Sequence, residues 1–507
     1  MGIAEMKQSK DDRLAGVLMP VASLPSKDGI GSFGREARRF VNLLAEMGMG
    51  VWQILPLNPL GFGNSPYQPY SSYAGDEIYI DLELLEKKGY LAPGRQVYTT
   101  EGDSSRINYE KARVYKTKYL REAYRGFLKK DLNSPGFIAF QKKDWVYPYA
   151  VFMALKKQNG LRCWNEWPKE QQDWILDQAY DINCLQDEIQ YQMFVQYMFY
   201  RQWKALKKYA NERNVLIMGD IPIYVGIDST DVWSCRENFL LDAQGRPSFV
   251  AGVPPDYFSA TGQRWGNPIY NWENLKKEGF SFWVKRLQYS SELYDILRID
   301  HFRAFDTYWK IPASCDTAIE GEWVEAPGYA LFDEIFRRLP DIRIVAEDLG
   351  DLRPEVLELR DQYHLMGMNI AEFSLLSPEP AKEHQLIYTG THDNQTVQGW
   401  YAALDGKTKG KVLIKLARYG MPWESVASKL VRYVYNSRAS MAIVPLADII
   451  GVDDDARLNT PGTVGSPNWE WRIPDWTDVL RRRKHLKKLV LKTARTPKKI
   501  KRRVDVQ

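Results

Sequence analysis

Residues 297–306, L-R-I-D-H-F-R-A-F-D, place a dense group of ionisable side chains directly after a short apolar run. Ile and Leu fill the run, which predicts a buried strand, and Asp300, His301 and Arg303 follow where that strand ends. In a (β/α)8 barrel, the carboxyl ends of the strands carry the catalytic residues. The stretch therefore predicts a barrel strand that ends at an active site.

Further apolar runs that end in polar residues bring the number of predicted strands to the eight that such a barrel requires. In chain order, the predicted strands are 16–21, 51–57, 215–221, 295–300, 342–347, 368–373, 386–391 and 442–446. Most follow segments with one apolar face at helical spacing, namely 37–47, 197–211, 282–291, 332–338 and 426–436. Strands of a closed parallel sheet are buried on both faces, which explains the nearly continuous Ile, Val and Leu. We expect an α/β fold, a (β/α)8 TIM barrel with large helical insertions at the carboxyl-end rim.

Two long connections interrupt the regular alternation and suggest how the chain is divided. Residues 14–57 and 214–480 are predicted to form the catalytic barrel, and residues 58–213 a mainly helical insertion subdomain between strands 2 and 3. Residues 481–507 are predicted to be a basic C-terminal helix or tail. Within the barrel, the Gly-, Pro- and aromatic-rich residues 252–268 predict a lid loop.

Composition excludes several classes of protein. Over 507 residues, 44% apolar and 26% charged residues are typical of a soluble globular protein. The richest apolar run, residues 441–452, contains Pro445 and Asp448, so no membrane span or membrane partner is expected. The 4 cysteines have no C-x-x-C spacing, which argues against a zinc site and a disulfide framework. Residues 1–13 lack the apolar core of a secretory signal, so a cytoplasmic location is expected.

The net charge of the chain is +5, and residues 481–503 hold most of the excess positive charge, so the rest of the chain is slightly acidic. A contact with nucleic acid or another acidic surface is one explanation of this cluster. A solvated terminal helix or tail is the simpler one, because no aromatic residue interleaves the charges as base stacking requires. We therefore expect no nucleic-acid partner.

Acidic residues close or follow three of the predicted strands. Asp300, Glu347 and Asp393 lie far apart in the sequence, and only a closed barrel would bring them together. Two carboxylates that flank an oxocarbenium-like centre are what glycosidic bond cleavage needs, and a third acid can hold sugar hydroxyls. Any one of the three alone would more simply be a salt-bridged or turn-capping carboxylate. Together, with His301 and His392 beside two of them, they favour chemistry.

The neighbours of these acids suggest their ionisation states. Arg298 lies on the same strand face as Asp300 and is expected to keep that carboxyl ionised. An apolar and aromatic setting would raise the pKa of Glu347 and suit it to donate a proton.

Aromatic residues supply a second argument for a sugar site. S-P-Y-Q-P-Y-S-S-Y at residues 65–73, and Tyr257, Phe258 and Trp265 in the expected lid, offer ring faces for the C–H faces of sugars. A tightly packed, Pro-stiffened loop is the alternative explanation of each ring.

Short motifs spread over residues 23–472 resemble those of a known family. They are S-L-P-S with G-I-G-S-F-G (23–34), W-Q-I-L-P-L-N-P (52–59), S-P-Y-Q-P-Y-S-S (65–72), G-D-I-P-I-Y-V (219–225), P-P-D-Y-F-S-A-T-G-Q (254–263), R-I-D-H-F-R (298–303), A-E-D-L-G (346–350), G-T-H-D-N (390–394), and N-T-P-G-T with N-W-E-W-R (459–472). The chain resembles glycoside hydrolase family 77, the amylomaltases or 4-α-glucanotransferases, relatives of the α-amylases.

The resemblance implies a role for each matching residue. Asp300 would be the nucleophile that forms a β-glucosyl ester, Glu347 the general acid/base and Asp393 the transition-state stabiliser. Substrate-binding residues would be Arg298, His392, Tyr67, Asp220, Tyr257, Trp265 and Asn394. The family moves α-1,4-glucan segments between malto-oligosaccharides, amylose or starch, or glycogen-derived glucans, with retention and without cofactor or metal. A monomer or weak homodimer is expected.

Three positions depart from the family pattern. Ala304, Glu372 and Gln395 stand where the family usually reads R-I-D-H-F-R-G, L-Q-F and T-H-D-N-D. None removes a catalytic carboxylate, but Glu372 and Gln395 change the charge near the site. Two other functions stay open: an α-glucan hydrolase of the same barrel type and a non-catalytic glucan-binding protein. The three intact acids argue against the second.

Overall fold

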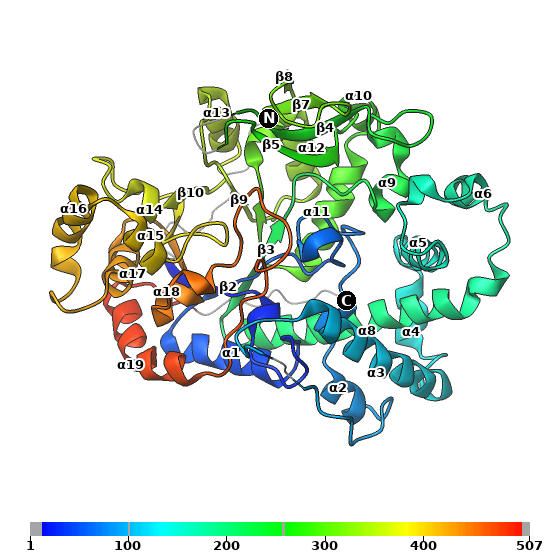
Figure 1. The fold of residues 1–507 in the computed structure, drawn as a ribbon, viewed down its shortest axis with the longest axis horizontal. Helices are drawn as coiled ribbons and strands as arrows, with labels where there is room; N and C mark the ends of the chain where they lie inside the picture. The colour runs from blue at the N-terminus through cyan, green and yellow to red at the C-terminus, as the bar shows by residue number, and fades with distance from the viewer. Residues whose placement is uncertain (1–12, 100–101, 256–258, 499–507) are drawn as a thin grey trace.

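The structure, a computed structural model, describes residues 13–99, 102–255 and 259–498. At its centre is an 8-stranded parallel sheet in the order β10-β11-β12-β1-β2-β3-β6-β9 (Figure 1). The strands are β1 (Leu14–Leu18), β2 (Val51–Gln53), β3 (Leu216–Ile221), β6 (Ile296–Ile299), β9 (Ile344–Ala346), β10 (Gly367–Ile370), β11 (Gln385–Tyr388) and β12 (Met441–Pro445). A parallel bridge between Val345 and Met366 joins β9 to the residue before β10, so the sheet nearly closes. The predicted (β/α)8 barrel is confirmed, and each predicted run overlaps one of these strands.

Helices cover the outside of the barrel. The larger ones are α1 (Arg35–Met47), α8 (Gln186–Asn211), α11 (Ser281–Leu293), α12 (Gly328–Arg338), α13 (Pro354–Gln362), α17 (Val426–Asn436) and α19 (Thr477–Lys492). The others are α9 (Thr230–Ser234), α10 (Trp272–Lys277), α14 (Ala371–Ser374), α15 (Val397–Ala403), α16 (Gly406–Leu416) and α18 (Leu446–Ile450). Within the described residues, no helix is both long and apolar enough to cross a membrane.

The sequence explains the local structure of α1. Ala37, Phe40, Val41 and Leu44 recur at helical spacing and are buried against the barrel. Gly48 ends the helix with φ 75°, a left-handed conformation that glycine adopts at little cost. The Phe40 ring packs edge-on against Trp52 of β2, with ring centres 5.1 Å apart.

The connection from β2 to β3 forms the cyan helical region at the right of Figure 1. It contains α2 (Leu82–Lys87), α3 (Tyr109–Lys130), α4 (Pro135–Gln141), α5 (Val146–Gln158), α6 (Lys169–Gln172) and α7 (Trp174–Asp177), and then α8. Early in α8, Phe194 packs on Phe127 of α3, whereas later Trp203 packs on Phe33 and Tyr294 beside the barrel. Helix α8 thus links the helical region to the barrel. The boundary of the insertion subdomain stays a prediction.

The segment predicted as a lid loop contains two strands at its ends. β4 (Phe249–Val253) and β5 (Gln263–Pro268) pair with β7 (Thr307–Pro312) and β8 (Glu322–Glu325) in a 4-stranded antiparallel sheet, in the order β5-β4-β7-β8. Gly252 allows this pairing, because a Cβ there would lie 2.2 Å from the Gln263 carbonyl oxygen. Tyr257 and its neighbours at 256–258 lie outside the described residues.

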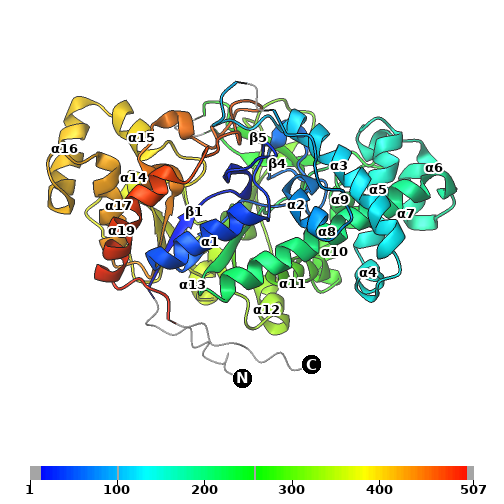
Figure 2. The same cartoon turned by 90° about the horizontal axis from the view of Figure 1, so that it is seen from below.

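The basic C-terminal segment is attached to the barrel. Helix α19 packs against α1 and buries Leu486, Leu489 and Val490 (Figure 2). Arg495 is fully buried, and its guanidinium donates to the carbonyls of Tyr435, Ser437, Ala439 and Leu14. This arginine therefore holds β1 and the turn after α17 together, a role that composition does not predict. Residues 499–507 lie outside the described residues.

Candidate active site

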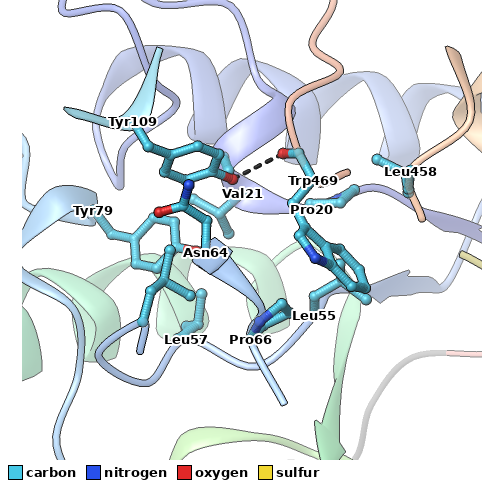
Figure 3. Close-up of a pocket in the computed structure, with 12 residues that line it drawn as sticks. Pro20, Val21, Leu55, Leu57, Asn64, Pro66, Tyr79, Tyr109, Leu458 and Trp469 are labelled. Carbon is cyan, nitrogen blue, oxygen red and sulfur yellow. Dashed lines mark hydrogen bonds between the residues drawn. The ribbon is translucent and has the colours of Figure 1, made fainter. Parts of the chain in front are cut away.

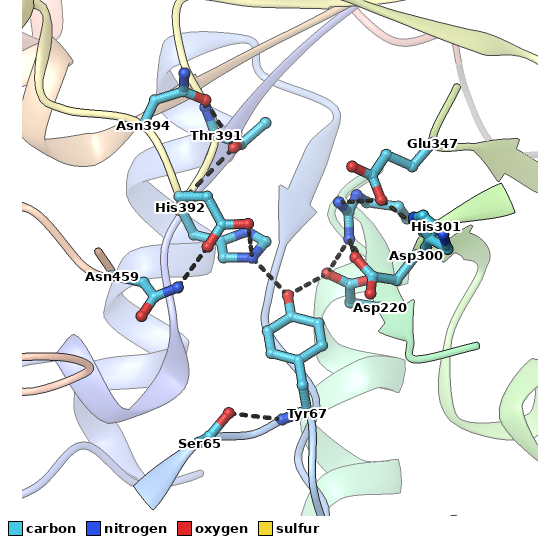
Figure 4. Close-up of polar contacts among 12 residues, drawn as sticks. Ser65, Tyr67, Asp220, Asp300, His301, Glu347, Thr391, His392, Asn394 and Asn459 are labelled. Carbon is cyan, nitrogen blue, oxygen red and sulfur yellow. Dashed lines mark hydrogen bonds and ion pairs between the residues drawn. The ribbon is translucent and has the colours of Figure 1, made fainter. Parts of the chain in front are cut away.

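Two acidic strand ends meet at one buried arginine. Arg298 in β6 lies beside Asp220 of β3 in the sheet register, and Asp300 and Glu347 directly follow β6 and β9. Arg298 Nη1 lies 2.7 Å from Asp220 Oδ2 and 3.1 Å from Asp300 Oδ1. Its Nη2 lies 3.3 Å from Glu347 Oε2 (Figure 4). Asp300 and Glu347 therefore face one guanidinium at the same barrel mouth, as the sequence led us to expect.

Arg298 and Asp220 form the buried floor of the site, whereas Asp300 and Glu347 are partly exposed above it. The side chains of Arg298 and Asp220 are 2% and 0% exposed, whereas those of Asp300 and Glu347 are 27% and 21% exposed. The buried Asp220 pairs with the arginine, so the floor carries no unpaired charge. The other two carboxyl groups can be reached by a molecule in the mouth.

The ionisation of this pair differs from the expectation. Burial and the nearby Glu347 carboxylate raise the pKa of Asp300 well above its usual value, since Arg298 divides its charge among three carboxyl groups. Burial also acts to raise the pKa of Glu347, but Arg298 and the His301 N–H outweigh it and lower that pKa. The two expected pKa directions are therefore wrong. Because Asp300 and Glu347 interact this strongly, each protonation step belongs to the pair of carboxyl groups and not to one residue.

His301 contributes through its backbone. Its φ of 49° lies in the left-handed region, which is unusual for a residue with a side chain. In this conformation its N–H donates to Glu347 Oε2 at 2.6 Å. Burial lowers the pKa of the imidazole to about 4, and the neutral ring packs edge-on against Trp265 with ring centres 4.8 Å apart. The sequence placed His301 beside the acid but gave no sign of this backbone hydrogen bond.

Asp393 joins the site from the opposite side through a chain of polar contacts. Asp393 Oδ2 lies 3.3 Å from His392 Nε2, which lies 2.8 Å from the Tyr67 hydroxyl. That hydroxyl donates to Asp220 Oδ2 at 2.8 Å, and Asp220 binds Arg298. Because the one hydroxyl proton goes to a carboxylate, His392 must donate from Nε2. The three predicted acids thus belong to one connected group of side chains (Figure 4).

Asn459 is a contact that sequence analysis missed. Its Nδ2 donates to Asp393 Oδ1 at 2.6 Å, and Arg457 donates to the Asp393 backbone carbonyl at 2.8 Å. Asn459 is the first residue of the N-T-P-G-T motif, and this motif was the sign in the sequence that could have pointed to its role. The side chain of Asp393 is nevertheless 42% exposed, so it remains accessible from the mouth.

Aromatic rings support this side of the site from behind. The rings of Tyr67 and His392 stack with centres 5.3 Å apart, and Trp469 packs against both. Behind Trp469 lies a mainly apolar cavity of about 20 Å³, lined also by Tyr79 and Tyr109 (Figure 3). The Tyr109 hydroxyl donates to the Trp469 carbonyl at 2.8 Å. A cavity of this size has room for water but not for a sugar ring, so it forms part of the supporting wall.

Asn394 and Glu372 lie next to each other beneath the loop that carries Asp393. The Asn394 side-chain oxygen accepts from the Thr391 N–H and hydroxyl at 2.8 Å, so it fixes the turn before Asp393. Glu372 is 8% exposed, and burial together with Asp448 raises its pKa to about 9. Gln395 donates to Asp454 at 3.0 Å. Of the departures from the family pattern, Glu372 is therefore the one that buries an extra acid.

Replacing Glu372 with Gln is expected to stabilise the protein at alkaline pH. The pKa of this carboxyl is about 9 in the folded chain and about 4.3 when unfolded. Its contribution to stability is therefore complete below about pH 4 and is lost as the pH rises towards 9. Between these limits the loss is up to about 1.4 kcal/mol per pH unit.

Thermal unfolding of the parent and Glu372→Gln between pH 5 and 8 measures this effect. The variant should gain at least about 2 °C in Tm over the parent at pH 8 and much less at pH 5. Glu379→Gln, at an exposed position, is the matched control and should show no such trend. An equal gain at every pH would contradict the assignment.

Within the described ranges, no three His, Cys, Asp or Glu side chains are grouped so that they could hold a metal ion. The carboxyl groups at the mouth are instead bound by Arg298, by backbone N–H groups and by side-chain amides. These partners orient carboxyl groups for acid, base or nucleophilic chemistry.

Comparison with known proteins identifies the family. The family model described as 4-alpha-glucanotransferase, glycoside hydrolase family 77, matches residues 19–478. The 4-alpha-glucanotransferase of Thermus thermophilus is 42% identical over 482 residues, which cover 91% of this chain and 95% of that protein. The one from Synechocystis sp. is 41% identical over 491 residues, 92% of this chain and 96% of that protein.

Solved structures agree with this result. The amylomaltase from Streptococcus agalactiae in complex with acarbose has a TM-score of 0.91 at 36% identity, over 96% of this chain and 100% of that one. The amylomaltase from Corynebacterium glutamicum shares the fold, with a TM-score of 0.74 at 17% identity, over 96% of this chain and 75% of that one. The chain therefore belongs to glycoside hydrolase family 77, the 4-α-glucanotransferases.

Proposed function

We propose that this 4-α-glucanotransferase acts by a retaining double displacement in which Asp300 is the nucleophile and Glu347 the general acid/base. The observation that carries the proposal is the contact of one buried guanidinium, Arg298, with both carboxyl groups. Two carboxyl groups held at one mouth can act on the two sides of a single glycosidic bond.

In the first step, Glu347 donates its proton to the glycosidic oxygen while an Asp300 carboxylate oxygen attacks C1. The C1–O bond breaks, an ester to Asp300 forms, and the reducing-end segment leaves with its 4-hydroxyl restored. The pKa directions favour the proton on Asp300 before substrate binds. Positive charge that develops at C1 favours an ionised Asp300, so the single proton of the pair is needed on Glu347 during reaction.

In the second step, the Glu347 carboxylate removes the proton from the 4-hydroxyl of an acceptor glucan. The acceptor oxygen attacks C1, the ester to Asp300 breaks, and two inversions give net retention. The His301 N–H and Arg298 hold Glu347 in place for both proton transfers. Asp393, fixed by Asn459, is positioned to accept hydrogen bonds from sugar hydroxyls that strengthen as C1 flattens.

The proposed substrates are malto-oligosaccharides, amylose or starch, and glycogen-derived glucans. The Streptococcus agalactiae amylomaltase was solved with acarbose, which supports a glucan-like ligand for the same mouth here. We assign sugar-ring contacts to Tyr67 and Trp265, with Tyr257 as a further candidate, and a monomer or weak homodimer as the working form. The helical insertion at residues 58–213 would form one wall of the groove.

Transfer rather than hydrolysis requires that water be kept from the ester. A hydrogen bond joins the loop after β2 to the β4–β5 hairpin: Gln68 Nε2 donates to the Trp265 carbonyl at 2.9 Å. Trp265 also packs on His301, next to the nucleophile. We assign the hairpin the role of the cover that excludes water.

Incubation with maltotriose as the sole substrate tests the proposed function. Transfer should give glucose together with maltopentaose and longer products, measured by anion-exchange chromatography over time. The number of reducing ends should stay constant, because each bond broken is matched by one formed. Shorter products only, with rising reducing ends, would identify a hydrolase, and no product at all would identify a binding protein.

A further inference from the structure

A basic pocket of about 400 Å³ lies between α17 and α19, outside the barrel. These two helices lie side by side at the left of Figures 1 and 2. The basic side chains that line the pocket are Arg418, Arg432, His485, Lys488 and Lys492. The glucan-transfer mechanism uses none of them.

Helical spacing brings these side chains to one place. His485, Lys488 and Lys492 lie on one face of α19, at intervals of three and four residues. On the same side, Leu489 is buried and holds this face against the body of the protein. Arg432 comes from α17, opposite, and Arg418 from the short 3-10 helix Ala417–Tyr419, so three segments of the chain supply the positive charge.

The positive charge in the pocket is only partly balanced. Arg432 pairs with Glu424, with Nη1 to Oε2 at 2.6 Å, and also donates to the Tyr419 carbonyl at 2.8 Å. Among the described residues, Arg418, Lys488 and Lys492 form no ion pair with a carboxylate. Side chains of like charge around one pocket raise the local potential and attract anions.

The surrounding positive charge affects the ionisation of His485. Burial, Arg432 and the other cations around it lower the pKa of its imidazole, although Glu424 acts in the opposite direction. A neutral His485 can accept from Arg432 Nη2, which lies 3.2 Å from its Nε2. The arginine is thereby held at the pocket by Glu424, the Tyr419 carbonyl and His485.

We propose that this pocket binds a small phosphate-bearing anion, either free phosphate or a phosphate ester. Arginine and lysine side chains together give forked and point-like donors that suit phosphate oxygens. The cavity volume of about 400 Å³ is that of a small-molecule site. Tyr419, Asn436 and Leu489 also line it, so an organic group next to the phosphate has apolar and polar contacts.

The pocket lies away from the glucan mouth. Asn436 ends α17 just before β12 begins, and Lys492 ends α19 just before Arg495, which binds the carbonyl of Leu14 at the start of β1. The pocket is therefore near the amino ends of the strands, whereas Asp300 and Glu347 follow their carboxyl ends. An anion bound there would not occupy the sugar site.

Isothermal titration calorimetry at low ionic strength tests the proposal with inorganic phosphate, ribose 5-phosphate and neutral ribose. Either phosphate compound should bind saturably at one site with a Kd below about 1 mM. Ribose should not bind. Tighter binding of ribose 5-phosphate would identify an ester as the preferred form, and equal binding would identify the phosphate group alone.

The double variant Lys488→Ala/Lys492→Ala should weaken binding by at least about tenfold, because two charge-assisted contacts are lost. Lys484→Ala/Lys487→Ala is the matched control: it removes the same charge from the same helix, at exposed positions outside the pocket, and should change the Kd less than about twofold. The Tm of each variant checks its folding. Equal loss of phosphate binding in both variants, or no saturable phosphate binding by the parent protein, would overturn the proposal.

Discussion

Asp300→Asn should reduce glucan transfer from maltotriose by about 10⁴-fold or more, while the protein stays folded and still binds glucan. The amide has nearly the same shape as the carboxylate, so it can keep its place beside Arg298. It is neutral and a poor nucleophile, so the ester to C1 cannot form. Initial rates of glucose release measure the loss, and calorimetry with acarbose measures the retained binding.

Asp306→Asn is the matched control for this experiment. Asp306 belongs to the same sequence stretch, but Arg353 binds both of its oxygens, at 2.6 and 2.8 Å. Its loss should lower Tm and leave activity within about tenfold of the parent, because it removes a structural ion pair and no reacting group. More than about 1% of parental activity in Asp300→Asn would assign the nucleophile to another residue.

Much of this site could be predicted from the sequence because the barrel imposes a simple geometric rule. Apolar runs locate the strands, and a polar residue at the end of a run must lie at the mouth. That rule placed Asp300 and Glu347 correctly, although they are distant in the chain. Arg298 was correctly placed on the same face as Asp300 by the alternation of side chains along a strand.

The pattern of apolar runs and polar strand ends could not predict features that depend on contacts between distant parts of the fold. Arg298 was expected to keep Asp300 ionised. Its neighbours in the sheet make it bind Asp220 and Glu347 as well, and the pKa directions of Asp300 and Glu347 are the reverse of those expected. The His301 N–H contact depends on a left-handed backbone that no residue type specifies. Composition placed Arg495 in a solvated segment, whereas the structure buries it among backbone carbonyls.

Glu347→Gln should reduce transfer from maltotriose by about 10²- to 10⁴-fold, because the leaving oxygen receives no proton. With α-maltosyl fluoride as donor, the first step should remain fast, since fluoride leaves without protonation. The second step lacks its base, so the maltosyl ester of Asp300 should accumulate. Mass spectrometry of the digested protein should find one maltosyl group on the peptide that contains Asp300.

Azide separates the role of Glu347 from a general loss of activity. Because azide is an anion, it can displace the ester at C1 without a base, with return of Asp300 as the free carboxylate. Glu347→Gln should therefore turn over α-maltosyl fluoride again in the presence of azide and form α-maltosyl azide. Asp300→Asn should form neither the adduct nor the azide product, because its first step is blocked. Failure of azide to restore turnover in Glu347→Gln would contradict the role of Glu347 as general acid/base. An adduct in Asp300→Asn would contradict the role of Asp300 as nucleophile.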